Sequence, residues 1–117
     1  MSNYRIQRVN AEIQKELTQI LREVKDPRLT DMVTVTAVNV EPDLKTGKAF
    51  VSIYSPTKER KMQNLEAIKA SAAFIRGALA HRIPQIRQIP RLTFHLDESL
   101  DYGERIDKLL DDINKKN

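Results

Sequence analysis

The sequence predicts an α+β fold in which helices pack on one face of a three-stranded sheet. Apolar side chains recur at steps of three and four through the first 24 residues, which is the spacing of an amphipathic helix. Two strand-like runs separated by a short turn sequence follow, and together they predict a β-hairpin. A long segment with helical spacing, a proline-bounded loop and a third alternating run come next. A hairpin combined with separate helices is typical of the α+β class.

Length and composition limit what the protein can be. The chain has 117 residues, enough for one hydrophobic core, so we expect a single domain over residues 1–117. It contains no cysteine, which suits a reducing cytoplasm. The opening sequence MSNYRIQRVNAEI has no uninterrupted apolar run, and no stretch approaches the roughly 20 apolar residues of a membrane span. We therefore expect a cytoplasmic monomer with no secretory signal and no membrane partner.

The first helix is expected from about Tyr4 to Val24. Ser2 or Asn3 can cap its start, and Asp26-Pro27 should end it, because the residue before a proline avoids helical geometry. Its apolar stripe consists of Ile6, Val9, Ile13, Leu17, Ile20, Leu21 and Val24. The opposite side alternates basic and acidic residues, which is typical of a solvated helix face with ion pairs.

Two strands should follow this helix. Met32 to Val40 is rich in valine and threonine, and its alternation changes parity near Ala37, which indicates either a β-bulge or a central strand covered on both faces. The segment Glu41 to Lys48 has a proline, an aspartate and a glycine suited to positive φ, so it should form the hairpin turn. Lys48 to Tyr54 alternates and predicts the antiparallel partner. Ser55-Pro56-Thr57 closes this strand, and Thr57 or Ser55 can cap the next helix.

The stretch Lys58 to Arg91 concentrates the positive charge of the chain. It has eight basic and two acidic residues, a net charge of +6, whereas the whole chain carries +4. Such a localised cationic surface points to a polyanion, most simply nucleic acid. One helix or two are expected here, and Ser71-Ala72-Ala73 is a run of small residues where a kink can occur. The apolar stripe consists of Leu65, Ile68, Ala72, Ile75, Leu79 and Ile83.

The remaining elements are a loop, a strand and a last helix. Pro84 to Pro90 should be a semi-rigid loop that carries Arg87. A third strand follows, with alternating apolar residues Leu92, Phe94 and Leu96. The tail from Ser99 has helical spacing and predicts a C-terminal helix. From Leu92 onward the net charge is −3, so the acidic tail and the basic middle should not face the same polyanion.

The expected order of elements matches a known RNA-binding scaffold, the type II KH domain. The prediction is an α-β-β-α-α-β arrangement plus a C-terminal helix. Its three-stranded sheet should be antiparallel or mixed, with the helices packed on one face. Because many small α+β domains share this order, function has to be argued from particular side chains.

Several cationic residues are candidates for phosphate contact. Lys69 and Arg76 lie seven residues apart off the apolar stripe, with the small Ala73 between them, so a phosphate backbone could come close. An ordinary solvated helix face is the alternative interpretation. Arg5 and Arg8 have fewer acidic neighbours than the rest of the first helix. The full set of candidate RNA-binding residues is Arg5, Arg8, Lys45, Lys48, Lys69, Ser71, Arg76, His81, Arg82, Arg87 and Arg91.

Nothing in the sequence favours catalysis. The two histidines, His81 and His95, do not form a metal-binding spacing, and they should lie on different elements. A nuclease that uses them as acid and base is the enzymatic alternative. The pair Asp111-Asp112 is more simply a solvated helix face than a magnesium site. We therefore expect no enzyme activity, no metal and no cofactor.

Four segments taken together resemble the bacterial ribosome-binding factor A family over the whole chain. They are YRIQRVNAEIQKEL, VKDPRLTDMVTVTAVNVEPDLKTGKAFVS, KASAAFIRGALAHRI and RLTFHLDESLDYGERIDKLL. The resemblance implies a cytoplasmic KH-fold factor that binds the small (30S) ribosomal subunit and its 16S rRNA. It also implies a role in late subunit maturation, including processing of the 16S precursor 5′ end, and in growth in the cold.

The resemblance also bears on how RNA is held. Members of the family lack the GxxG loop of ordinary KH domains and show Ala-x-Gly at a bend between two helices, where this chain has Ser71-Ala72-Ala73. Without that glycine the bend should use a negative φ or be milder, and binding should rest on shape and charge. The alternative function is a protein-interaction module that docks its acidic C-terminal helix on a ribosomal protein.

Overall fold

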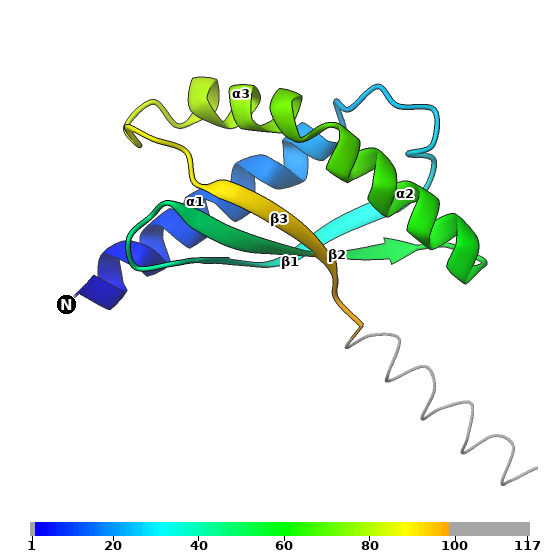
Figure 1. Ribbon diagram of the computed structural model, residues 1–117, viewed down its shortest axis with the longest axis horizontal. Helices are drawn as coiled ribbons and strands as arrows, with labels where there is room; N and C mark the ends of the chain where they lie inside the picture. The colour runs from blue at the N-terminus through cyan, green and yellow to red at the C-terminus, as the bar shows by residue number, and fades with distance from the viewer. Residues whose placement is uncertain (1, 99–117) are drawn as a thin grey trace, which may run out of the picture.

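Figure 1 shows the computed structural model, which describes residues 2–98 of the chain. The elements are α1 (Ser2–Leu21), β1 (Met32–Val40), β2 (Thr46–Tyr54), α2 (Lys58–Ala70), α3 (Ala72–Arg82) and β3 (Arg91–Leu96). The C-terminal helix expected from Ser99 onward lies outside the described residues. None of the described helices is long and apolar enough to cross a membrane.

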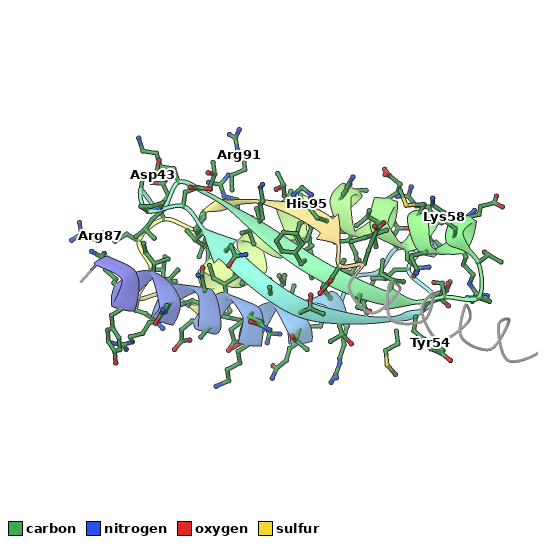
Figure 2. All side chains as sticks on the ribbon, turned by 90° about the horizontal axis from the view of Figure 1, so that it is seen from below. Asp43, Tyr54, Lys58, Arg87, Arg91 and His95 are labelled. Carbon is green, nitrogen blue, oxygen red and sulfur yellow. The ribbon has the colours of Figure 1, made fainter. Side chains whose placement is uncertain are left out.

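The strands form one mixed sheet in the order β1-β2-β3, with β1 antiparallel and β3 parallel to β2. All three helices lie on one face of this sheet, as Figure 1 and Figure 2 show. Alternate residues of β2 are buried toward the helices, and they are Gly47, Ala49, Val51 and Ile53. This architecture confirms the predicted KH-like α+β fold.

The core is built from the predicted apolar stripes. Its largest fully buried aliphatic side chains are Ile13, Leu17, Ile20, Val51, Ile68, Ile75, Leu79 and Ile83. They come from α1, from the central strand and from the two helices that connect β2 to β3, so one core holds all these elements together. Burial of this apolar surface is the main stabilising force of the fold.

The first helix begins and ends earlier than the sequence suggests. Ser2 and Asn3 already lie inside α1, ahead of the expected start at Tyr4. At the other end Arg22 and Glu23 donate backbone hydrogen bonds to carbonyls three residues back, at 3.1 and 2.9 Å. These shorter bonds tighten the last turn and end the helix before Val24, which packs against the core from outside it.

The parity change in β1 is a β-bulge. The pairing with β2 shifts register between Val35 and Ala37, so Thr36 is the extra residue. Val35, Val38 and Val40 therefore all face the core even though their numbers differ in parity. The alternative of a central strand is wrong, because β1 lies at an edge of the sheet.

The hairpin turn uses Leu44, not the glycine, for its left-handed residue. Leu44 has φ 61°, and Asp43 Oδ1 accepts a hydrogen bond of 3.0 Å from the Lys45 backbone N–H just beyond it. Gly47 instead lies within β2, which starts two residues before Lys48. A Cβ on Gly47 would lie 3.1 Å from Val40 Cγ2, so the glycine permits close strand packing.

A single residue separates the two helices of the basic stretch. Ser71 has φ −95° and ψ 14°, and its backbone N–H is shared between the carbonyls of Ala67 and Ile68 at 3.2 and 3.1 Å. The bend therefore uses a negative φ, as expected without a glycine. Ala72 was predicted on the apolar stripe but is exposed, because the interruption at Ser71 breaks the helical register.

Candidate nucleic-acid interface

The first feature of the surface is a groove of about 280 Å³ between α3 and β3. Its floor is apolar and includes Ile75, Leu79, Ile89 and Phe94, all of them buried. The small side chains of Ala72 and Ala73 form one end, next to the break between the helices. Arg76 on α3 and Arg91 at the start of β3 line the same groove, and both residues are exposed.

The second feature is a hollow of about 530 Å³ where three segments meet. The N-terminal part of α1 contributes Tyr4, Arg5, Arg8, Val9 and Glu12, the hairpin turn contributes Asp43 and Leu44, and the loop before β3 contributes Gln85, Ile86, Arg87 and Gln88. Figure 2 shows Asp43, Arg87 and Arg91 at the same end of the molecule, opposite Tyr54 and Lys58. The loop before β3 therefore borders both the hollow and the groove.

The arginines at these two features have no carboxylate partner among the residues that the structure describes. Within residues 4–98, no carboxylate lies within 4.0 Å of Arg5, Arg8, Arg76, Arg87 or Arg91. Exposed guanidinium groups held in this way present their full charge to solvent, and each offers five donors to a phosphate. The structure thus places five of the predicted residues at the groove and the hollow.

Lys45 and Lys48 lie next to this set. Lys45 is exposed in the hairpin turn, and its carbonyl accepts a 2.9 Å hydrogen bond from the backbone N–H of Arg91. Lys48 is exposed on β2, on the face of the sheet turned away from the buried residues Gly47 and Ala49. Neither lysine lines the groove or the hollow.

Arg82 has a different environment from the other candidates. Its guanidinium donates to Gln19 Oε1 at 3.1 Å and to Glu23 Oε1, and it lies 3.6 Å from Glu16 Oε2. Only 26% of its side chain is exposed. Arg82 therefore ties α3 to α1, and the helix acids already compensate its charge. Lys69 is also near an acid, with Nζ 3.9 Å from Glu66 Oε1.

The two remaining candidates for RNA contact, Ser71 and His81, are weaker than the arginines. The Ser71 hydroxyl donates to the Ala67 carbonyl at 2.9 Å, so its hydrogen is already used within the helix bend. His81 is exposed on α3. His95 lies on β3 with its ring 5.5 Å from that of Phe50, on the open side of the sheet that faces the viewer in Figure 2. The two histidines are therefore separated by the sheet and do not form an acid–base pair.

Sequence reasoning found only the arginines of the hollow and missed, among others, three side chains that could contact a base. Tyr4 and the amides of Gln85 and Gln88 line it beside the arginines. A tyrosine directly before Arg5 and glutamines on both sides of Arg87 were visible signals, but nothing local shows that residues 4 and 88 meet. Among residues 4–98, no group of three or more histidines or carboxylates is placed to hold a metal ion.

Together these observations define the class of the protein. The mixed sheet, the order of elements and the pair of helices broken at Ser71 make it a KH-like α+β domain. Five arginines with no carboxylate partner in residues 4–98 gather around its groove and its hollow.

Comparison with known proteins gives the family. The family model described as Ribosome-binding factor A matches residues 5–110. The ribosome-binding factor A of Clostridium beijerinckii is 43% identical over 118 residues, covering 100% of this chain and 99% of that protein. The chain therefore belongs to the ribosome-binding factor A family.

Solved structures of relatives agree with the fold. The crystal structure of ribosome-binding factor A from Thermus thermophilus is 26% identical with a TM-score of 0.69, covering 80% of this chain and 97% of that chain. A homology model of the Thermus thermophilus factor, fitted into the cryo-EM map of a 30S complex, is also 26% identical. Its TM-score is 0.62, and the match covers 76% of this chain and 91% of that one.

Proposed function

We propose that this protein is a non-enzymatic assembly factor that binds the small (30S) ribosomal subunit through phosphates of 16S rRNA. The observation that carries the proposal is the set of five arginines, Arg5, Arg8, Arg76, Arg87 and Arg91, with no carboxylate within 4.0 Å in residues 4–98. Family membership supports it, and so does the relative fitted into a 30S complex. The step in which the factor acts is late 30S maturation, including processing of the 16S precursor 5′ end. It acts as a cytoplasmic monomer.

The groove suggests how RNA is held. Arg76 and Arg91 supply charge to a groove whose floor is apolar, and the alanines at its end allow a sugar-phosphate backbone to approach closely. Lys45, Lys48 and Lys69 add longer-range attraction around this surface, and the exposed His81 offers a ring nitrogen for a hydrogen bond to the RNA. Arg82 contributes by holding α3 against α1, since its charge is already paired.

The test is binding of the full-length protein to purified immature small subunits over a range of salt concentrations. Arg76→Gln and Arg91→Gln should each weaken binding and lower the slope of log K against log salt by about 0.7 to 0.9, because each removes one phosphate contact. Arg22→Gln is the matched control. Arg22 is an exposed arginine directly after α1, and it lines neither the groove nor the hollow.

The alternative function predicts a different result. A module that docks on a ribosomal protein through the acidic C-terminal segment should bind that protein without RNA and with little dependence on these arginines. If both groove variants keep the parent slope while binding persists, the phosphate mechanism is rejected. Crosslinks mapped on immature subunits would then identify the surface that is used.

A further inference from the structure

The hollow next to the N-terminal part of α1 contains an aromatic ring as well as cations. Tyr4 is 70% exposed and lines the hollow together with Arg5, Arg8 and Arg87. A large ring that stays exposed to solvent adds little to the stability of the fold. In a concave, cationic site, the same ring can stack on a base. With a volume of about 530 Å³, the hollow lies in the size range of small-molecule sites, about 300–1,000 Å³.

The charges of the hollow favour an anion. Three guanidinium groups come from α1 and from the loop before β3, and within residues 4–98 none lies within 4.0 Å of a carboxylate. Glu12 and Asp43 also line the hollow, so its three guanidinium groups and two carboxylates give it a net charge of +1. This positive balance favours a bound phosphate.

We propose that this hollow binds a single nucleotide of RNA, with the base against the Tyr4 ring and the phosphate among Arg5, Arg8 and Arg87. The amides of Gln85 and Gln88 have both donors and acceptors for base edges. This inference rests on the proposed function and adds a base contact to it. A stacked base is sequence-tolerant, since every base has a π-face.

The hollow is distinct from the groove but shares a wall with it. Residues 85–88 of the loop line the hollow, and residues 89 and 90 of the same loop line the groove. An RNA strand that crosses this loop therefore meets both sites in turn. The buried Ile89 and Pro90 anchor the loop between them, so its conformation is held before RNA arrives.

Tyr4 variants test the nucleotide site in the full-length protein with immature small subunits. Tyr4→Leu keeps apolar bulk but removes the ring, and it should weaken binding about 5- to 100-fold, as loss of one stacked base does. Tyr4→Phe keeps the ring and should bind within about twofold of the parent. The salt slope should be unchanged by Tyr4→Leu, since no charge is lost, and lowered by about 0.7 to 0.9 by Arg8→Gln.

The control is Tyr54, another largely exposed tyrosine that lies outside the hollow. Tyr54 is 82% exposed at the opposite end of the molecule, and Tyr54→Leu should leave binding unchanged. The chain has three tyrosines and no tryptophan, so a Tyr54→Phe, Tyr102→Phe variant reports on Tyr4 alone. Its tyrosine fluorescence should be quenched when RNA stacks on the ring.

The outcomes separate this site from the function on which it rests. If Tyr4→Leu binds subunits as tightly as Tyr54→Leu and the Tyr4 fluorescence is unchanged, the nucleotide site is rejected while subunit binding stands. If the parent protein does not bind subunits at all, the proposed function and this site fail together. Equal thermal unfolding midpoints for Tyr4→Leu and the parent exclude a folding defect as the cause of weaker binding.

Discussion

At the scale of single residues, the buried amide of Asn64 makes the densest set of hydrogen bonds in the described residues. Its side chain is 0% exposed, yet every polar atom is used. Oδ1 accepts from the backbone N–H groups of Thr30 and Asp31 at 2.9 and 3.0 Å. Nδ2 donates to Asp31 Oδ2 at 2.9 Å and to the Arg60 carbonyl at 2.8 Å. One amide thereby joins the segment before β1 to α2.

Replacing this amide should cost considerable stability. Asn64→Ala leaves two backbone N–H groups without their acceptor, and we expect the free energy of unfolding to fall by about 2–3 kcal/mol. Urea denaturation measures the change. Gln63→Ala, at the exposed neighbouring position of the same helix, should stay within about 0.5 kcal/mol of the parent. Equal losses in both variants would show that the network contributes nothing specific.

A second residue-scale prediction concerns acid pH. The pKa of Asp26 lies below its ordinary value, chiefly because Arg28 donates side-chain hydrogen bonds to it and also its backbone N–H. A carboxylate with a lowered folded pKa adds stability above its unfolded pKa and loses it as pH falls through the folded pKa. We expect Arg28→Gln to raise the pKa of Asp26, as measured by NMR titration. An unchanged pKa would contradict the assigned cause.

At the scale of elements, Arg82 holds two helices together. It contacts Gln19, Glu16 and Glu23 of the α1 segment from the last turn of α3. We expect Arg82→Gln to lower the free energy of unfolding by about 1 kcal/mol, a modest value because Glu23 is half exposed and screened by solvent.

Arg76→Gln should have the opposite effects to Arg82→Gln on stability and on subunit binding. It should leave stability within about 0.5 kcal/mol of the parent but lower the salt slope of subunit binding, whereas Arg82→Gln should keep that slope. Chemical denaturation and salt-dependent binding on the same two proteins separate the roles. If Arg82→Gln also lowers the salt slope of subunit binding, Arg82 contacts RNA phosphate after all.

Replacement by alanine should change the stability in opposite directions at Gly47 in β2 and at Gly77 in α3. Gly77 lies inside α3, and a Cβ there would meet nothing within 4 Å, so Gly77→Ala should stabilise by about 0.5–1 kcal/mol. At Gly47 the added Cβ would lie 3.2 Å from the Asn39 carbonyl oxygen and 3.2 Å from Leu92 Cδ2. Gly47→Ala should therefore destabilise. Thermal unfolding gives both signs, and a shared sign would refute the packing argument.

At the scale of the whole molecule, the two faces of the sheet have different roles. The helices and the core occupy one face, and the arginines of the groove and the hollow gather where that layer meets the loop before β3. His95 lies on the other face, within 2.8 Å of Thr93 Oγ1. The sheet thus separates the only two histidines of the chain.

This separation predicts the absence of nuclease activity. RNA incubated with the purified protein and Mg²⁺ should remain intact, because the two histidines cannot act together across the sheet and, among the described residues, no group of three or more histidines or carboxylates is placed to hold a metal ion. Gel analysis of labelled precursor RNA provides the measurement. Cleavage that disappears in His81→Ala would instead establish an enzyme.

Local patterns were sufficient for much of the fold. The strand Met32–Val40 and the KH-like order follow from periodicity and turn residues. The bulge near Ala37 was one of two interpretations of the parity change, and the structure selects it. Thr57 was one of two candidate caps for α2, and its hydroxyl accepts from Arg60 N–H at 3.1 Å. Each depends on neighbours a few positions apart, so the chain carries the information locally. The type of residue at the site was also predictable, since exposed arginines are visible in any sequence.

The tertiary structure decided which charges are available. Arg82 and Arg76 look alike in the sequence, but within residues 4–98 only Arg82 meets acids about 60 positions away, Glu16 on α1 and Glu23 just after it. The hollow likewise exists only because residues 4, 43 and 87 converge, and no local pattern encodes that meeting. Composition and periodicity determine how much charge a chain has and which elements it forms. Whether a given charge faces solvent or another side chain depends on long-range packing, because Coulomb interactions act through space and not along the sequence.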